Sequence, residues 1–216
     1  MTKFSCISVL SLLIFLSCKE VKNETKSKAQ KEAVQISTAG TTYKIDAKNS
    51  VITWKGFAVV DGHNGTISIS EGVVNFEKGH LKAGNFIIDM GTIAVLDLED
   101  EEENGDLVGH LKSEDFFDVE KFPTSEFVLT DIEEKENKTF LRGNFTLKGT
   151  IRNIEFPVVV SKQGKEVTMV SKPFTIDRTE WGIIYDSGKF FKDLKDELIK
   201  DEIEITINLK GFLDDK

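Results

Sequence analysis

The sequence predicts an all-β domain with antiparallel strands. Apolar residues recur with a period of two, turn-forming pairs separate the apolar runs, and strands do not alternate with helices. The strictest alternation covers residues 202–210 and places four apolar side chains on one face: Ile203, Ile205, Ile207 and Leu209. A strand with one apolar and one polar face is typical of antiparallel sheets. Eight or more such strands predict an up-and-down barrel or a sandwich.

The other strands are expected wherever the same alternation recurs. Pairs such as Asn64-Gly65, Lys78-Gly79 and Gln163-Gly164 are typical of the tight turns that join antiparallel strands. In chain order, the expected strands lie near Ser50–Phe57, Gly65–Phe76, Leu81–Met90, Ser125–Ile132, Thr139–Lys148, Phe156–Ser161, Glu166–Val170 and Lys172–Asp177.

Two segments have helical rather than strand-like spacing. In Asp106–Phe117 the apolar residues Leu107 and Leu111 lie one turn apart, and Asn104 or Asp106 is suited to cap the helix. Residues 189–200 predict a second short helix, with apolar residues at intervals of three and four. Either helix would cover one end of a barrel.

Composition limits the domain count and the partners. The chain has 216 residues, of which 39% are hydrophobic, which fits one globular domain with a leader. Acidic residues outnumber basic ones by 37 to 28, so the average field repels a phosphate backbone. Nucleic acid is therefore excluded as the main partner.

The first residues are typical of a secretion signal that ends at a lipidated cysteine. A basic start precedes the apolar run Phe4–Leu16, which is too short to span a bilayer. The run ends in Phe-Leu-Ser-Cys, which resembles a bacterial lipobox, so residues 1–17 are predicted to be a lipoprotein signal peptide. Cys18 would then carry the lipid anchor, and Lys19 after it resembles lipoproteins sorted to the outer membrane. We therefore expect a cell-envelope protein anchored there, facing the periplasm or the cell surface.

Residues 18–42 are polar and rich in lysine, which predicts a flexible tether before a folded domain at 43–216. Cys6 would leave with the signal and Cys18 would become a thioether. The mature chain would then hold no free thiol, and neither a disulfide nor thiolate chemistry is expected.

No pattern in the sequence predicts catalysis, a metal or a cofactor. Within the acidic run 97–106, residues from Asp100 onward have spacing like a calcium loop. Counted from Asp100, however, the third position is Glu102 and the twelfth is Leu111, where calcium ligands of other types are needed. The histidines His63, His80 and His110 are too far apart for a metal motif. Nucleophile elbows and dinucleotide fingerprints are also missing from the sequence. The protein is therefore predicted not to be an enzyme.

Arg178 is the polar residue of most interest, because the chain has only three arginines and apolar and aromatic residues flank this one. It would serve either as an internal ion-pair partner or as a polar handle at the mouth of a pocket. The sequence leaves both roles open.

Three segments resemble the YceI-like, polyisoprenoid-binding family. They are His110–Phe127 (HLKSEDFFDVEKFPTSEF), Gly143–Val158 (GNFTLKGTIRNIEFPV) and Ile176–Ile183 (IDRTEWGI), and the opening at Tyr43–Ile52 also fits. The resemblance runs from about residue 43 to residue 211. It implies an extended, lipocalin-like, eight-stranded antiparallel barrel with one or two short helices.

The resemblance further implies that the barrel holds a long isoprenoid or fatty-acyl lipid and performs no catalysis. Each buried CH₂ group would contribute roughly 0.8 kcal/mol. Arg178 and His110 are the residues expected at the ligand head group. The expected tunnel residues are Trp54, Phe76, Phe86, Phe116, Phe127, Phe145, Leu147, Phe174 and Trp181.

The alternation of residues does not distinguish a hollow barrel from a filled one. A rival hypothesis is an anchored interaction module that presents the acidic run 97–106 to another envelope protein. A hydrolase acting on envelope lipids is a third. The sequence also leaves open whether the protein is a monomer or a homodimer.

Overall fold

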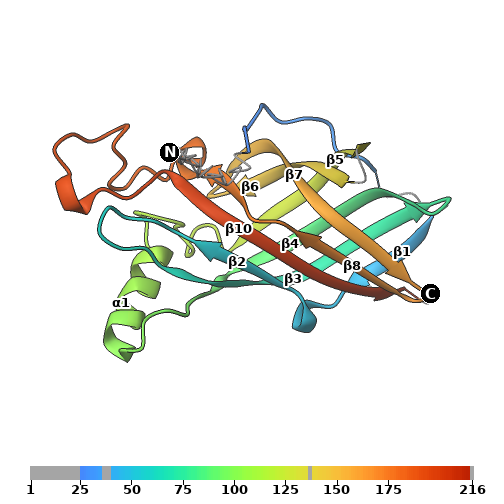
Figure 1. The fold of residues 1–216 in the computed structure, drawn as a ribbon, viewed down its shortest axis with the longest axis horizontal. Helices are drawn as coiled ribbons and strands as arrows, with labels where there is room; N and C mark the ends of the chain where they lie inside the picture. Colours follow the sequence, from blue (N-terminus) through green and yellow to red (C-terminus); the bar gives the residue numbers. More distant parts are fainter. Residues whose placement is uncertain (1–24, 36–39, 136–137, 215–216) are drawn as a thin grey trace, which may run out of the picture.

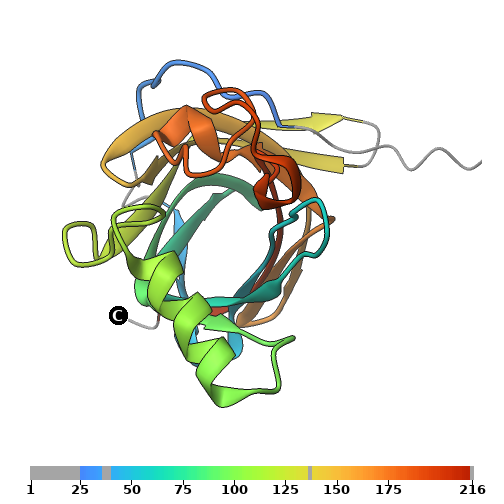
Figure 2. The same ribbon diagram turned by 90° about the vertical axis from the view of Figure 1, so that its left-hand side faces the viewer.

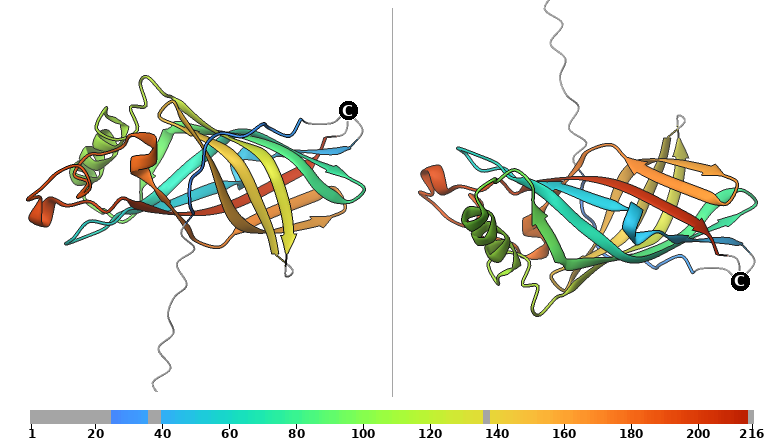
Figure 3. Two further views of the ribbon diagram at one scale, coloured as in Figure 1. Left: turned by 90° about the horizontal axis from the view of Figure 1, so that it is seen from above. Right: turned by 90° about the horizontal axis from the view of Figure 1, so that it is seen from below.

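The structure, a computed structural model, describes residues 25–35, 40–135 and 138–214. One antiparallel sheet curls into an elongated barrel with a helix at one end (Figures 1 and 3), which confirms the all-β prediction. None of the helices in these ranges is long and apolar enough to cross a membrane. The elements are β1 (Thr41–Ile45), η1 (Ala47–Asn49), β2 (Val51–Lys55), β3 (Asn64–Glu77), β4 (His80–Val95), α1 (Glu101–Lys112), β5 (Thr124–Lys135), β6 (Lys138–Leu147), β7 (Thr150–Gln163), β8 (Glu166–Ser171), β9 (Phe174–Asp177), η2 (Arg178–Trp181), η3 (Lys195–Glu197) and β10 (Glu202–Leu213).

Strand β10 closes the barrel. The hydrogen-bonded order is β1-β10-β2-β3-β4-β5-β6-β7-β8, and β8 also pairs with β10. Strand β1 pairs with β10 and β3, the same neighbours as β2, while β9 pairs with β10 beside β8. The described strands therefore form a ring of eight positions, two of which hold an interrupted pair of strands. This is the eight-stranded antiparallel barrel that the family resemblance implies.

The acidic run forms the start of α1, five residues before the predicted start at Asp106. The Asp100 carboxylate accepts hydrogen bonds from the backbone N–H groups of Glu102 and Glu103, both at 3.0 Å. Three glutamates in the first turn interact favourably with the positive end of the helix dipole. The part of the acidic run that resembled a calcium loop, from Asp100 onward, is therefore the N-terminus of a helix.

The second predicted helix, at 189–200, is wrong. Only the short turn η3 forms there. Within the segment, Asp193 and Lys195 have positive φ angles of 63° and 51°, and this left-handed backbone interrupts a helix. The apolar residues of the segment had helical spacing, but the backbone follows an irregular path over the end of the barrel.

Residues 25–35, which we call the strap, lie along the outer surface of the barrel (Figure 1). The Thr25 N–H donates to the carbonyl of Thr175 in β9 at 3.0 Å, and Lys28 exchanges two backbone bonds with Asn153 of β7, at 2.8 and 2.9 Å. Because β6 occupies the other edge of β7, the strap enters the seam between β7 and β9, which do not pair. The prediction of a flexible tether is therefore wrong for residues 25–35, since sheet-like bonds hold them.

Two buried asparagines on the barrel hold the middle of the strap. Asn144 accepts a hydrogen bond from the Lys31 N–H at 3.0 Å and donates to the Lys31 carbonyl at 2.6 Å. The Asn153 amide donates to Asn144 Oδ1 at 3.1 Å. Further along, the Val34 N–H donates to the carbonyl of Leu129 in β5 at 2.9 Å. The strap thus covers polar side chains that solvent would otherwise reach.

We expect Asn144→Ala to release the strap and to leave the barrel folded. The substitution removes both hydrogen bonds to Lys31, so local opening should increase and trypsin should cleave after Lys31 about tenfold faster. The matched control is Asn49→Ala, which removes a side-chain bond to Asp46 and none of the hydrogen bonds that hold the strap. Equal cleavage rates in the two variants would show that Asn144 does not hold the strap.

Candidate functional site

The barrel encloses a cavity of about 140 Å³, the space in which the centre of a water-sized sphere can move. Every strand from β2 to β10 contributes lining side chains, and almost all of them are apolar. The lining residues are Ile52, Trp54, Gly56, Ile67, Ile69, Phe86, Ile88, Met90, Leu111, Phe116, Phe117, Phe127, Leu141, Phe145, Leu147, Ile154, Phe156, Val158, Met169, Phe174, Ile176, Arg178, Ile199, Lys200, Ile203, Ile205, Ile207 and Leu209.

The cavity approaches one end of the barrel, which we call the mouth. Helix α1, the β2–β3 loop and the segment 182–201 lie around this end (Figure 2), and they contribute Leu111, Gly56 and Ile199 to the lining. At the other end the rings of Tyr43 and Phe76 meet edge to face with centroids 5.5 Å apart, and neither lines the cavity. The cavity is therefore closed at that end by packed side chains.

The alternation in the sequence explains the apolar wall. In β10 the four apolar side chains of alternate residues face the cavity. A glycine supports one of the aromatic residues, because a Cβ on Gly143 would collide with the ring of Phe127 on the neighbouring strand. Gly143 thus lets the Phe127 ring lie against β6.

Four phenylalanine rings form a continuous row along the wall. Phe86 and Phe127 lie 6.4 Å apart between centroids, Phe127 and Phe156 lie 5.3 Å apart, and Phe156 stacks on Phe174 at 4.4 Å. The row connects β4 to β9 across the sheet. Its members fix one another's orientation, which gives the cavity a rigid apolar side.

Arg178 is buried at the mouth, with 1% of its surface exposed. Its Nη1 donates to the Ile183 carbonyl at 2.9 Å, Nη2 to the Ile199 carbonyl at 3.1 Å, and Nε to the Lys200 carbonyl at 3.2 Å. The guanidinium carbon lies 5.8 Å from the centre of the Phe116 ring. One buried side chain therefore holds both ends of the mouth segment, residues 182–201, and also lines the cavity.

Charged groups around Arg178 complete this attachment. Burial lowers the pKa of the Arg178 guanidinium, and the nearby carboxylate of Asp201, 3.9 Å away, opposes that shift. Lys189 pairs with Asp177 and, at 3.2 Å, with Asp201. Burial alone would raise the pKa of Asp177, but hydrogen bonds from Lys189 and Thr179 outweigh it and hold the pKa below its usual value. The mouth segment is thus fixed by charged pairs as well as by Arg178.

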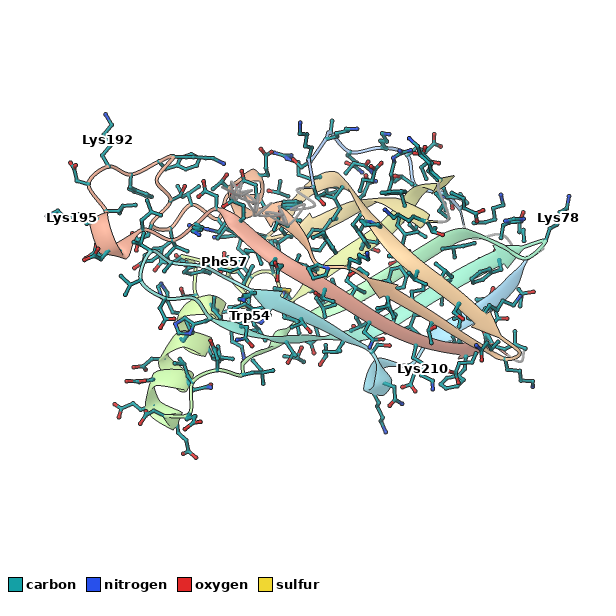
Figure 4. All side chains as sticks on the ribbon, in the orientation of Figure 1. Trp54, Phe57, Lys78, Lys192, Lys195 and Lys210 are labelled. Atoms are coloured by element: carbon teal, nitrogen blue, oxygen red, sulfur yellow. The ribbon has the colours of Figure 1, made fainter. Side chains whose placement is uncertain are left out.

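The nitrogen-bearing side chains that line the cavity are all hydrogen-bond donors: Trp54, Arg178 and Lys200. The indole N–H of Trp54 is buried, and in the described part of the chain it has no hydrogen-bond partner. Figure 4 shows Trp54 on β2, on the mouth side of the barrel. The lining therefore offers donors to a ligand but no carboxylate, amide or hydroxyl acceptor among the described side chains.

The comparison with protein families identifies the domain. Residues 43–211, most of the chain, match the family described as the YceI-like domain. The chain belongs to that family. The YceI-like domain is 25% identical over 131 residues to a "UPF0312 protein" of Pseudomonas putida, a match that covers 57% of this chain and 64% of that relative.

Solved structures agree with the YceI-like fold. The crystal structure of BcnA from Burkholderia cenocepacia superposes with a TM-score of 0.61 at 23% identity, covering 77% of this chain and 98% of that one. A polyisoprenoid binding domain from Saccharophagus degradans has a TM-score of 0.55 at 10% identity, covering 79% and 98% of the two chains. At these identities the likeness establishes the fold alone.

Most of the predicted tunnel residues line the cavity of the YceI-like domain. Phe76 and Trp181 do not, and for them the predicted position is wrong. Phe76 packs against Tyr43 at the closed end. Trp181 packs on the Phe145 ring at 5.5 Å and donates its indole N–H to the Phe145 carbonyl at 3.1 Å. The predicted residues that do line the cavity are Trp54, Phe86, Phe116, Phe127, Phe145, Leu147 and Phe174.

The two residues predicted at the head group do not meet in the cavity. Arg178 lines it, whereas His110 lies outside the lining. The His110 ring instead contacts Phe116 and Tyr185 edge on, at 5.0 and 4.7 Å, and its Nε2 lies 3.4 Å from Asp115. His110 thus packs against Phe116, a lining residue, without facing the cavity itself. Cys18, the predicted lipid anchor, lies outside the described residues.

Sequence reasoning missed several lining residues. Phe156 and Val158 lie in a predicted strand, and their alternation was a sufficient signal. Ile199 and Lys200 come from an irregular segment, where no local period indicates which side chain faces inward.

Proposed function

We propose that this YceI-like protein binds a long-chain isoprenoid or another amphipathic lipid in the cavity, as a carrier, store or sensor in the cell envelope. The apolar cavity, closed at the end opposite the mouth, is the observation that carries the proposal, because it fits a slender hydrocarbon chain and offers little to a polar ligand. The polyisoprenoid binding domain among the similar structures supports the same ligand class.

The polar end of the ligand is proposed to accept hydrogen bonds at the mouth. Among the described residues, backbone carbonyls use three of the five N–H groups of Arg178, which leaves two that a ligand could accept from. The unpaired indole N–H of Trp54 is a second donor in the same lining. A phosphate, carboxylate or carbonyl oxygen satisfies such donors, whereas an unmatched hydroxyl or amine hydrogen would stay unpaired.

Organic extraction of the purified protein followed by lipid mass spectrometry tests the proposal. We expect a stoichiometric long-chain lipid whose polar end carries an acceptor oxygen. If no lipid is recovered, and the protein takes up none when offered, the proposal fails and an anchored interaction module becomes the better hypothesis.

We further propose that the mature protein begins at a lipidated Cys18 and is anchored in the outer membrane, as the lipobox-like residues 15–18 suggest. Two or three acyl chains on one cysteine would give essentially permanent anchoring. Metabolic labelling with an alkyne fatty acid should mark the wild type and leave Cys18→Ala unmarked. Cys6→Ala is the matched control and should be labelled like the wild type; label that survives in Cys18→Ala would place the modification elsewhere.

A further inference from the structure

Exposed apolar side chains gather on the loops around the mouth. Phe190 and Phe191 are 55% and 46% exposed, and Val59 and Val60 are 55% and 76% exposed. The two loops touch, because the Val59 N–H donates to the Leu198 carbonyl at 3.1 Å. We call these two phenylalanines and two valines the mouth surface. Figure 4 shows the neighbouring Lys192 and Lys195 at the outermost part of this end of the molecule.

The phenylalanines of the mouth surface are held outward by the local backbone. The N–H groups of Phe190 and Phe191 both donate to the Ser187 carbonyl, at 3.0 and 2.9 Å. The preceding residue, Lys189, is fixed to Asp177. Most of the other phenylalanines in the described residues are at least partly buried. Two adjacent rings on a fixed turn therefore form a preorganised apolar contact rather than an isolated exposed side chain.

The charges beside these rings favour a partner without strong charge. The mouth segment 182–201 carries four lysines and five acidic residues, so its charges nearly cancel. On another side of the mouth, α1 begins with a run of acidic residues. An anionic partner would be repelled by that helix, and the balanced segment would attract neither sign strongly.

The strap brings the proposed anchor close to the mouth. Thr25 is bonded to Thr175, two residues before Asp177, which in turn holds Lys189 next to Phe190. Six residues lie between Cys18 and Thr25, so an extended chain would span at most about 25 Å between these two positions. A bilayer that holds Cys18 therefore lies within reach of the mouth surface.

We propose that the mouth surface inserts into a lipid bilayer, so that a lipid passes between the bilayer and the cavity without crossing water. The contact is apolar, and it lies beside the end of the barrel that the cavity approaches. This inference rests on the proposed lipid binding. Binding to zwitterionic vesicles should depend little on salt, because burial of rings rather than charge drives it.

Bromolipid quenching tests the insertion directly. The full chain with Cys18→Ser, so that no acyl anchor attaches it, is mixed with vesicles of brominated phosphatidylcholine. The fluorescence of the tryptophan introduced by Phe191→Trp should be quenched. The fluorescence of the tryptophan introduced by Val159→Trp should not, since Val159 is 67% exposed on β7 of the barrel wall. Any attachment through the leader is common to both variants, and the signal of Trp54 and Trp181 is subtracted. Equal quenching at both positions, or none at either, would overturn the proposal.

A transfer assay separates this proposal from the proposed function. Phe190→Ser combined with Phe191→Ser should lower partitioning to the same vesicles by about 10²-fold, since burying one ring corresponds to about tenfold. Lipid transfer between vesicles should slow in parallel, while the lipid content of the purified protein stays unchanged. Unchanged transfer would reject the role of the mouth surface. A wild type without extractable lipid would instead reject the proposed function, whatever the quenching result.

Discussion

Replacing Arg178 by methionine should lower the free energy of unfolding by about 3–5 kcal/mol, because three backbone carbonyls would lose their donor together and Asp201 would keep only Lys189 as a charged partner. Methionine fills much of the same space but donates no hydrogen bond. Urea unfolding measures the change. The matched control is Arg152→Met, whose partner Glu180 lies 3.6 Å away on the surface, and there we expect less than about 1 kcal/mol. Equal effects in the two variants would show that the carbonyl contacts of Arg178 contribute little.

The same position distinguishes support of the mouth from recognition of a head group. Arg178→Gln keeps one amide donor, so part of the support should survive. If Arg178 also contacts the head group, the substitution should weaken the binding of a lipid with a phosphate or carbonyl end about tenfold more than the binding of a headless hydrocarbon of equal length. If both ligands weaken equally and the melting temperature falls, the role of Arg178 is structural only.

Leu147→Trp should remove nearly all bound lipid and leave the barrel folded. Leu147 lies at the end of β6, is 4% exposed and lines the cavity. A larger ring there would occupy space that the ligand needs, and some strain in the core is expected. Lipid content by mass spectrometry and β-type circular dichroism are the two measurements. Val159→Trp adds the same ring outside the barrel and should keep its lipid; retention of lipid in Leu147→Trp would contradict a ligand in this cavity.

The fold followed from the sequence because strand alternation is a local signal. Each predicted strand overlaps an observed one, and the inward residues of β10 were read directly from their spacing. Alternation says which side chains face inward, but it does not say whether they meet in the middle. A hollow interior depends on ring diameter and on side chains from all the strands, and these are non-local properties.

The mouth could not be predicted for the same reason. The role of Arg178 depends on carbonyls of Ile183, Ile199 and Lys200, of which two are about twenty residues away along the chain. The apolar residues of 189–200 have helical spacing, and the two residues there with positive φ, Asp193 and Lys195, are not glycines. The sequence therefore carried no local signal that the helix is interrupted. The strap was predicted to be a tether because the groups that bind its backbone lie on β5, β6, β7 and β9, about a hundred residues or more away along the chain.

Closure by β10 also determines the order in which the molecule can fold. Residues 202–213 pair with β1 and β2 on one edge and with β8 and β9 on the other, so those strands have free edges until the C-terminal segment is available. Pairing between residues more than 150 positions apart, such as Ile52 with Ile207, makes this a slow step of high contact order. A chain emerging from synthesis or translocation therefore exposes both edges and the whole apolar wall until its last strand arrives, and this is when it is most exposed to aggregation.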